Sequence, residues 1–425
     1  MVSHVILLSY DAFGERDWEL AKTQPNLARL IENGAYTTKL RSVHPTLTYT
    51  VHTTMVTGVY PDKHGIFHNN PFQPFVPEKE REWFWHREAI QVPTIYDAMK
   101  KKGLTAAGLL WPVSGKSSLK YNMPEVHAIH KENQALKIMK NGSPLFCLGL
   151  ELRHGKIRKG IEQPYLDDFT TACAIDTIKR KKPNLLLIHL LELDDAKHRY
   201  GTGSLEAKEA IIHMDRRIGE LAKAIEETGL KDKTVLMVVG DHSQLDVRYK
   251  VRLNQILQKA GLIYEDKGQL QWRAYLQSTG GGAYLYFKEG DREAEEIALD
   301  TIANAMKEGC YGIERVISPQ EMAELRVKTR AAYMIEAKEG YSFEDTLEGP
   351  IILDLASKGM KYATHGYLPD KENYGCNFLV VGPGIKKNFS FGPTEMVDIA
   401  PTIGRLLGVE FTHGDGRVLH EIFLD

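Results

Sequence analysis

The sequence has few cysteines, almost no net charge and no long apolar run. Its four cysteines lie far apart among 425 residues and form no CxxC pair, so they indicate neither a disulfide scaffold nor a thiolate zinc site. The 54 basic and 56 acidic side chains nearly cancel, and no block of Lys or Arg suggests a surface for a nucleic-acid polymer.

Other absences bear on location. No stretch approaches the roughly 18 apolar residues of a membrane span. Residues 1–9 have neither a basic start nor an apolar run long enough for a signal peptide. Together with the sparse cysteines, these observations predict a cytoplasmic protein that does not associate with membranes. They say nothing about its oligomeric state.

Short β-rich runs alternate with longer helical patterns along the chain. This alternation is typical of parallel strands that helices cover on both faces, so it predicts an α/β fold with a largely parallel sheet. The clearest strands are expected at residues 5–9, 185–191, 234–239 and 378–381. Helices are expected at residues 204–228, and after Pro25 and Pro93 up to Gly34 and Gly103.

Two regions interrupt this alternation. Residues 120–165 show no sustained period, and residues 245–360 contain a strand-like run at 282–287 and a helical pattern at 293–306. We interpret both as insertions on one core sheet. The chain is therefore expected to form a single domain over 1–425, with a probable inserted subdomain at 245–360.

Metal-type ligands follow the predicted strands. In an open parallel sheet, ligands bind beyond the carboxyl ends of the strands, so side chains at these positions are expected to converge. Oxygen and imidazole donors without cysteine suit zinc or manganese. The six candidates are Asp11, Asp194, His198, Asp241, His242 and His365.

A threonine-rich segment supplies a candidate nucleophile. Thr46, Thr48 and Thr50 occur where a loop should turn into a helix, and one of them is expected to cap it. A hydroxyl at a helix N-terminus lies near free N–H groups and the positive end of the helix dipole, which also suit a phosphate.

The segment from Thr48-Tyr49 to Val56-Thr-Gly-Val-Tyr-Pro-Asp-Lys-His-Gly-Ile66 resembles the nucleophile region of nucleotide pyrophosphatase/phosphodiesterases, which belong to the alkaline phosphatase superfamily. The resemblance covers nearly the whole chain. It extends through the six candidate ligands, in order, to the closing Met396-Val-Asp-Ile-Ala-Pro-Thr.

This resemblance implies an alkaline-phosphatase-like core and a hydrolase of phosphodiester or pyrophosphate bonds. It implies two divalent ions, probably Zn²⁺, and a covalent intermediate on Thr48. One ion would lie next to Thr48 and the other in a second set of ligands. The two implied sets are Asp11, Asp241 and His242 with Thr48, and Asp194, His198 and His365.

The resemblance also implies roles for residues beside the metals. Asn69 matches the asparagine that donates to a phosphoryl oxygen, although Asn70 is its direct neighbour. Tyr49 is expected to stack on a substrate base, and His189 stands where a tyrosine of the nucleotide pocket often occurs. Aromatic residues between Phe72 and Trp85 are expected to form either a substrate wall or a satellite core.

Other substrates remain open on the same two metals. The alternatives are a phosphonoacetate-type hydrolase and a phosphomonoesterase, for which Lys116 or Lys120 would supply an extra cation unless both are solvated surface residues. A metal-dependent mutase would use a serine, so Thr48 argues against it. A non-catalytic scaffold would have lost ligands. We therefore expect a small phosphodiester, nucleotide or phosphonate as the partner.

Overall fold

The computed structural model describes residues 2–411 and 413–424, and its largest element is a nine-stranded sheet. The strand order is β18-β2-β17-β6-β1-β5-β3-β4, with β19 beside β2. All neighbours run parallel except β17, which is antiparallel to β2 and β6. The predicted α/β fold with a largely parallel sheet is confirmed. The strands are β1 (His4–Tyr10), β2 (Gly34–Arg41), β3 (Ala106–Leu109), β4 (Tyr121–Met123), β5 (Leu185–Leu190), β6 (Thr234–Gly240), β17 (Cys376–Val381), β18 (Phe389–Ser390) and β19 (Thr394–Glu395).

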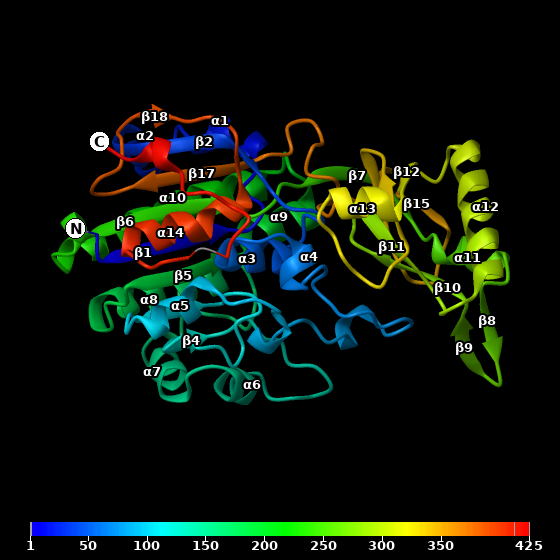
Figure 1. Ribbon diagram of the computed structural model, residues 1–425, viewed down its shortest axis with the longest axis horizontal. Helices are drawn as coiled ribbons and strands as arrows, with labels where there is room; N and C mark the ends of the chain where they lie inside the picture. The colour runs from blue at the N-terminus through cyan, green and yellow to red at the C-terminus, as the bar shows by residue number, and fades with distance from the viewer. Residues whose placement is uncertain (1, 412, 425) are drawn as a thin grey trace.

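Helices cover both faces of this sheet (Figure 1). Alternate side chains of β1 enter two different cores, with Ile6 and Leu8 in one and Val5 and Leu7 in the other. This is the pattern of a strand that is buried on both sides. The first core is closed by α2 (Pro25–Asn33), α7 (Pro144–His154), α8 (Tyr165–Arg180) and α10 (Leu205–Glu227). The second is closed by α3 (Thr48–Thr57), α5 (Ile95–Lys101) and α14 (Ile399–Leu407).

A second group of strands lies at the right of Figure 1. Its antiparallel sheet has the order β10-β11-β13-β12 and packs on α12 around a core of its own. The strand and helix expected at 282–287 and 293–306 are both present, while the boundary of a subdomain at 245–360 stays a prediction. The elements are β10 (Ala274–Ser278), β11 (Gly282–Phe287), β12 (Ile313–Ile317), β13 (Tyr333–Ala337), α11 (Asn254–Lys259), α12 (Arg292–Glu308) and α13 (Pro319–Glu324).

A small mixed sheet joins the two groups. Its central strand is β7, which pairs with β14, β15 and β16. The members are β7 (Leu245–Val251), β14 (Gly340–Phe343), β15 (Ile352–Asp354) and β16 (Ala363–Thr364), and the remaining pair is β8 (Ile263–Asp266) with β9 (Gln269–Trp272).

Residues 120–165 are not simply an insertion. They begin with β4, which pairs with β3 at the edge of the main sheet, and continue into α6 (Gln134–Asn141) and α7. A three-residue strand and two short helices separated by Gly and Pro leave too little periodicity to detect in the sequence. The region therefore completes one edge of the core sheet.

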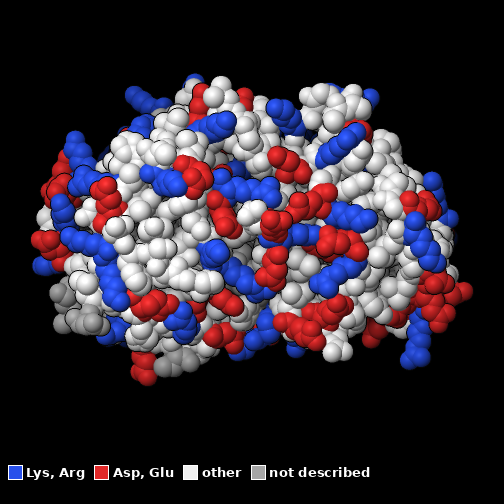
Figure 2. Space-filling model, turned by 90° about the horizontal axis from the view of Figure 1, so that it is seen from above, with Lys and Arg blue, Asp and Glu red and all other residues white. Residues whose placement is uncertain are grey.

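The surface mixes both signs of charge. Figure 2 shows a face on which Lys and Arg side chains are interspersed with Asp and Glu. Within the described ranges, no helix is both long and apolar enough to cross a membrane. The short helices not yet named are α1 (Trp18–Ala21), α4 (Pro61–His64) and α9 (Glu192–Tyr200).

Candidate metal centre

The candidate ligands lie where the central strands end. Strands β1, β5 and β6 are neighbours and run parallel, so their carboxyl ends open at the same edge. Asp11 follows β1, while Asp241 and His242 follow β6. Helix α9 begins directly after β5 and carries Asp194 and His198 one turn apart, on one face. His365 follows β16.

Thr48 is the first residue of α3. The cap position is occupied by Leu47, which offers no side-chain hydrogen bond, so the expectation that a threonine caps this helix is wrong. The Thr48 hydroxyl is instead 3.2 Å from Nε2 of His242. It therefore lies at the helix N-terminus and beside the candidate ligands.

Five of the six candidate ligands form two adjoining clusters. Donor atoms of Asp194, His198 and His365 lie within 4.8 Å of one another, as the sequence predicts for the second metal. Donor atoms of Asp11, Asp194 and His242 form the other cluster. Asp241, expected in place of Asp194, is nearby, because its Oδ2 is 3.3 Å from Nε2 of His242. Asp194 thus stands between the two sets.

Hydrogen bonds orient two of the histidines for metal binding. Nδ1 of His198 is 2.7 Å from the carbonyl oxygen of Ala363, and Nδ1 of His365 is 2.8 Å from that of Thr46. Because a carbonyl only accepts, each Nδ1 carries the proton and each Nε2 keeps its lone pair. Both Nε2 atoms face Asp194, at 3.4 Å and 4.0 Å from its carboxylate oxygens. A lone pair facing a carboxylate is favourable only with a cation between them.

Buried carboxylates that have no partner support the same fit. Oδ1 of Asp11 and Oδ2 of Asp241 are buried and accept no hydrogen bond within the described part of the chain. Burying a carboxylate oxygen without a partner destabilises the fold, unless a hydrogen-bond donor or a cation contacts it. The oxygen and imidazole donors present here are suitable for a divalent cation such as zinc.

Burial shifts the pKa values of these ligands toward their neutral forms. It raises the pKa of Asp241 to about 7, and burial together with the neighbouring Asp194 and Asp241 raises the pKa of Asp11 well above its usual value. Burial also lowers the pKa of His365 to about 4. Burial lowers the pKa of His242 as well, so His242 and His365 are neutral near pH 7, which is the form that binds metal.

Asn69 lies at the start of α3. Its Oδ1 accepts a hydrogen bond of 3.0 Å from the backbone N–H of Tyr49, next to Thr48. This contact fixes the orientation of the amide, since the N–H donor must face the oxygen. Asn70 instead donates to the carbonyl oxygen of Glu82. Of the two asparagines, only Asn69 thus makes contact beside Thr48, and its Nδ2 remains a free donor within the described residues.

Tyr49 does not line the cleft. Its ring is fully buried, contacts Trp83 edge to face at 5.1 Å and donates to Oε1 of Glu125 at 3.3 Å. No face of the ring is open to a ligand, so the expectation that Tyr49 stacks on a substrate base is wrong. Tertiary packing buries the Tyr49 ring, because residues 83 and 125, which lie outside its helix, cover it.

A buried hydrogen-bonded chain reaches the metal ligands from behind. His189, in β5, lies between Oδ2 of Asp11 at 3.1 Å and Oε2 of Glu125 at 3.0 Å. Burial lowers the pKa of His189, but the hydrogen bonds to the two carboxylates outweigh it and raise that pKa well above its usual value. The sequence reasoning missed this role, although a histidine inside an apolar strand was a visible signal.

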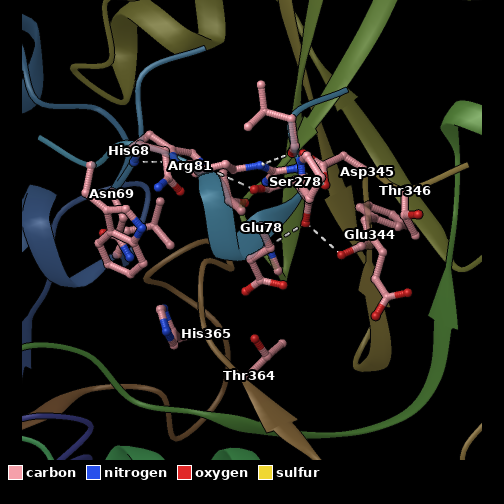
Figure 3. Close-up of a pocket in the computed structure, with 18 of the residues that line it drawn as sticks. His68, Asn69, Glu78, Arg81, Ser278, Glu344, Asp345, Thr346, Thr364 and His365 are labelled. Atoms are coloured by element: carbon pink, nitrogen blue, oxygen red, sulfur yellow. Dashed lines mark hydrogen bonds and ion pairs between the residues drawn. The ribbon is translucent and has the colours of Figure 1, made fainter. Parts of the chain in front are cut away.

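The ligands open into a cleft of about 820 Å³. Figure 3 shows Asn69 and His365 on one side and Glu344, Asp345 and Thr346 on the other. The opposite wall comes from β14 of the small mixed sheet and from β10 of the second group of strands. Of the expected aromatic wall, Phe75 and Trp83 line the cleft, whereas Phe72 stacks on Tyr286 in a satellite core.

The cations of this cleft are already paired. Arg81 donates to Asp345 at 3.0 Å, and Nζ of Lys250 lies 3.0 Å from Glu344 and 3.8 Å from the centroid of the Tyr362 ring. Lys116 and Lys120, considered for the alternative substrates, are exposed and are not among the residues that line the cleft.

The sequence profile described as type I phosphodiesterase / nucleotide pyrophosphatase matches residues 5–368. The chain belongs to this family. The venom phosphodiesterase of Macrovipera lebetinus is 25% identical over 251 residues, which are 56% of this chain and 25% of the relative. Family member 1 of the human ectonucleotide pyrophosphatase/phosphodiesterases is 28% identical over 222 residues, 51% of this chain and 21% of the relative. The match thus spans a quarter or less of these relatives.

Solved structures of the phosphodiesterase family share the fold. Murine ectonucleotide pyrophosphatase/phosphodiesterase 5 superposes with a TM-score of 0.70 at 19% identity, over 99% of this chain and 100% of the other. The human protein of the same name gives 0.69 at 18% identity, with the same coverage. The predicted alkaline-phosphatase-like fold is confirmed.

Proposed function

We propose that this chain hydrolyses phosphodiester or pyrophosphate bonds of small nucleotide-like substrates, through a covalent intermediate on Thr48. The position of Thr48 carries the proposal. Its hydroxyl lies at the first turn of α3, makes no capping bond and faces His242 at 3.2 Å. A hydroxyl placed beside buried carboxylates without partners has little structural use but suits nucleophilic attack.

Two divalent ions, which we take to be zinc, complete the site in this proposal. When bound, they would polarise the phosphoryl group and lower the pKa of the attacking and departing oxygens. The residues that would hold them are Asp11, Asp241 and His242 beside Thr48, and Asp194, His198 and His365 in the second set.

The protein side chains account for the remaining steps. Oγ1 of Thr48 forms a bond to phosphorus while the bond from phosphorus to the leaving oxygen breaks. The departing alcohol or phosphate keeps the electron pair of that bond, and overall it takes up the hydroxyl proton of Thr48. Asn69 donates from Nδ2 to a non-bridging oxygen, as do free N–H groups of the first turn of α3. Water then cleaves the bond to Oγ1, giving its hydroxide to phosphorus and its proton to Thr48.

Related proteins support this substrate class. Several relatives are venom phosphodiesterases. A threonine-to-alanine variant of murine family member 5, described as inactive, was solved in complex with AMP. A cleft of about 820 Å³ is large enough for a nucleotide. Since Tyr49 is buried, we assign contact with the base to Trp83.

Hydrolysis assays test this proposal. We expect the zinc-loaded protein to cleave p-nitrophenyl thymidine-5′-phosphate faster than p-nitrophenyl phosphate, and a chelator or Thr48→Ala to abolish both rates. A preference for the monoester would move the substrate to phosphomonoesters. Cleavage of phosphonoacetate alone would favour the phosphonate alternative. Full activity of Thr48→Ala would refute the proposal.

We keep a cytoplasmic location as a second, separate proposal. All four cysteines are unpaired, and Cys310 is exposed, which suits a reducing compartment. Fractionation of the native cells, with an antibody against the chain, tests it. Recovery with extracellular or periplasmic markers would contradict it.

A further inference from the structure

The most apolar exposed surface of the described residues lies on α6, α7 and the loop that follows. Thirteen large hydrophobic side chains are exposed in the described residues, and six of them fall between 136 and 161. Three of the six lie on α7 at positions i, i+3 and i+7, which is one face of a helix. This leucine ridge consists of Leu145, Leu148 and Leu152, exposed by 86%, 45% and 78%.

Helix α7 is apolar on two faces. Phe146, Cys147 and Leu150 pack into the core of the main sheet, while the leucine ridge points away from it. A helix that is hydrophobic on all sides normally has apolar surroundings on all sides. Figure 1 shows α6 and α7 along the lower edge of the molecule, beyond β4.

The ridge continues into an apolar cavity of about 150 Å³. Leu148 and Ile161, both exposed on the outside, also line this cavity, together with Ile138 and Met139 of α6. The apolar surface is therefore broader than one helix face. It joins α6, α7 and the loop up to residue 161.

Basic residues flank the leucine ridge in the sequence. Residues 131–161 contain seven Lys and Arg but two Glu, in a chain whose net charge is −2. Both glutamates are neutralised locally, Glu132 by Lys137 at 2.6 Å and Glu151 by Arg158 at 2.7 Å. The segment therefore presents unpaired positive charge, and the lysines that form no salt bridge within the described residues are Lys131, Lys140, Lys156 and Lys159.

We propose that the leucine ridge and its lysines dock this protein onto an anionic lipid bilayer. Protruding leucines suit a bilayer, because acyl chains accept convex apolar side chains whereas a protein partner would need a matching groove. The flanking lysines can reach lipid phosphates while their stems stay in apolar surroundings. A symmetric dimer through this ridge would oppose two positively charged surfaces, which disfavours a second copy as the occupant.

This proposal revises the expectation that the protein does not associate with membranes. That expectation rested on the absence of a spanning segment and of a Lys/Arg block. A surface helix needs neither, since it lies in the interface rather than across it. The lysines and leucines alternate with other residues within 131–161, so they form neither a basic block nor a long apolar run in the sequence.

Vesicle co-sedimentation of the full chain tests the docking surface. We expect binding to vesicles of phosphatidylcholine with phosphatidylserine, and weak binding to phosphatidylcholine alone. The double variant Leu145→Ser/Leu152→Ser should lose at least about tenfold in vesicle affinity, because each leucine contributes apolar area. The matched control Leu205→Ser/Leu424→Ser removes two leucines that are exposed elsewhere and should bind normally.

Two double variants that reverse the charge of lysines test the role of the lysines separately. Lys140→Glu/Lys156→Glu should weaken binding to anionic vesicles, while Lys208→Glu/Lys223→Glu on α10 should not. All four variants should retain the hydrolytic rate of the parent, since none lies in the cleft. This readout separates failure of the docking surface from failure of the proposed function.

Three results would overturn the proposal. The first is no binding to either kind of vesicle at low salt. The second is equal binding by Leu145→Ser/Leu152→Ser and the parent. The third is a dimer in solution that these two substitutions dissociate, which would assign the ridge to a protein partner.

Discussion

At the site, Thr48 and Thr46 have different roles, because one supplies a reactive group and the other orients a ligand. Thr48 offers its hydroxyl to the clusters, whereas Thr46 holds His365 through its carbonyl oxygen and accepts the N–H of Gly366 through Oγ1 at 2.9 Å. The residue types and their order were predictable from the sequence. Burial was not, because whether Tyr49 or Trp83 faces the cleft depends on segments distant along the chain.

His189 should set the geometry of Asp11. In His189→Gln the amide nitrogen can still donate to Asp11, whereas in His189→Asn it reaches only toward Glu125. We expect zinc affinity of the metal-free protein to fall about 10- to 100-fold in His189→Asn, as is typical for loss of a ligand's supporting hydrogen bond, and to fall less in His189→Gln. Titration with zinc in a calorimeter measures this. Equal affinities in the two variants would contradict the role.

Trp83 should contribute to binding of a nucleotide base. In Trp83→Leu we expect KM for p-nitrophenyl thymidine-5′-phosphate to rise about tenfold, since stacking on a base is worth roughly 1–3 kcal/mol. The KM for methyl p-nitrophenyl phosphate, which has no base, should be unchanged. A similar rise for both substrates would indicate a distorted cleft instead.

At the scale of elements, neighbouring parallel strands bring the ligands together. The strands β1, β5 and β6 follow from buried apolar runs, so the positions of the ligands after each strand were predictable. The order of the strands in the sheet and the helix α9 were not predicted. Strand β2 was not predicted, because Thr and Lys interrupt its apolar residues. The far wall of the cleft, at residues 344–346, is placed by β14 and could not be read from local patterns.

The loop that presents His365 depends on a glycine. Gly366 has φ of +89°, and a Cβ there would lie 1.7 Å from the carbonyl oxygen of Thr279. We expect Gly366→Ala to displace His365 and to lower the zinc content of the purified protein, measured by atomic absorption. Gly340→Ala is the control, because Gly340 has a similar φ of +84° but open space around it. If both variants retain full zinc, the loop does not position the ligand.

At the scale of the whole molecule, the chemistry of the cleft is concentrated on one wall. Segments that follow strands of the main sheet supply five candidate ligands and the nucleophile, and the loop after β16 supplies His365. Strands β10 and β14 supply the opposing surface (Figure 3). The leucine ridge lies beside β4, at the opposite edge of the main sheet from β18.

Buried neutral histidines should make folding stability depend on pH. Burial lowers the pKa of His64 to about 3, below its unfolded value of about 6.5. The unfolded chain therefore binds the extra proton first, and stability falls as pH drops below about 6.5. When the pH falls from 7 to 5, the free energy of unfolding should decrease by about 2 kcal/mol because of His64.

Urea unfolding of the parent and of His64→Asn measures this effect. The Asn side chain can still accept the N–H of Ile66, which Nδ1 of His64 accepts at 3.1 Å. The variant should lose less stability than the parent over the same pH interval. An identical pH dependence would show that His64 is not the group responsible.

The covalent role of Thr48 is the central claim, and it can be measured directly. The zinc-loaded protein is mixed with p-nitrophenyl thymidine-5′-phosphate, quenched in acid within the first turnover and digested for mass spectrometry. The account predicts a thymidylyl adduct on the peptide that contains Thr48, absent from Thr48→Ala. Rapid product formation with no adduct on that peptide, or an adduct on another residue, would contradict it.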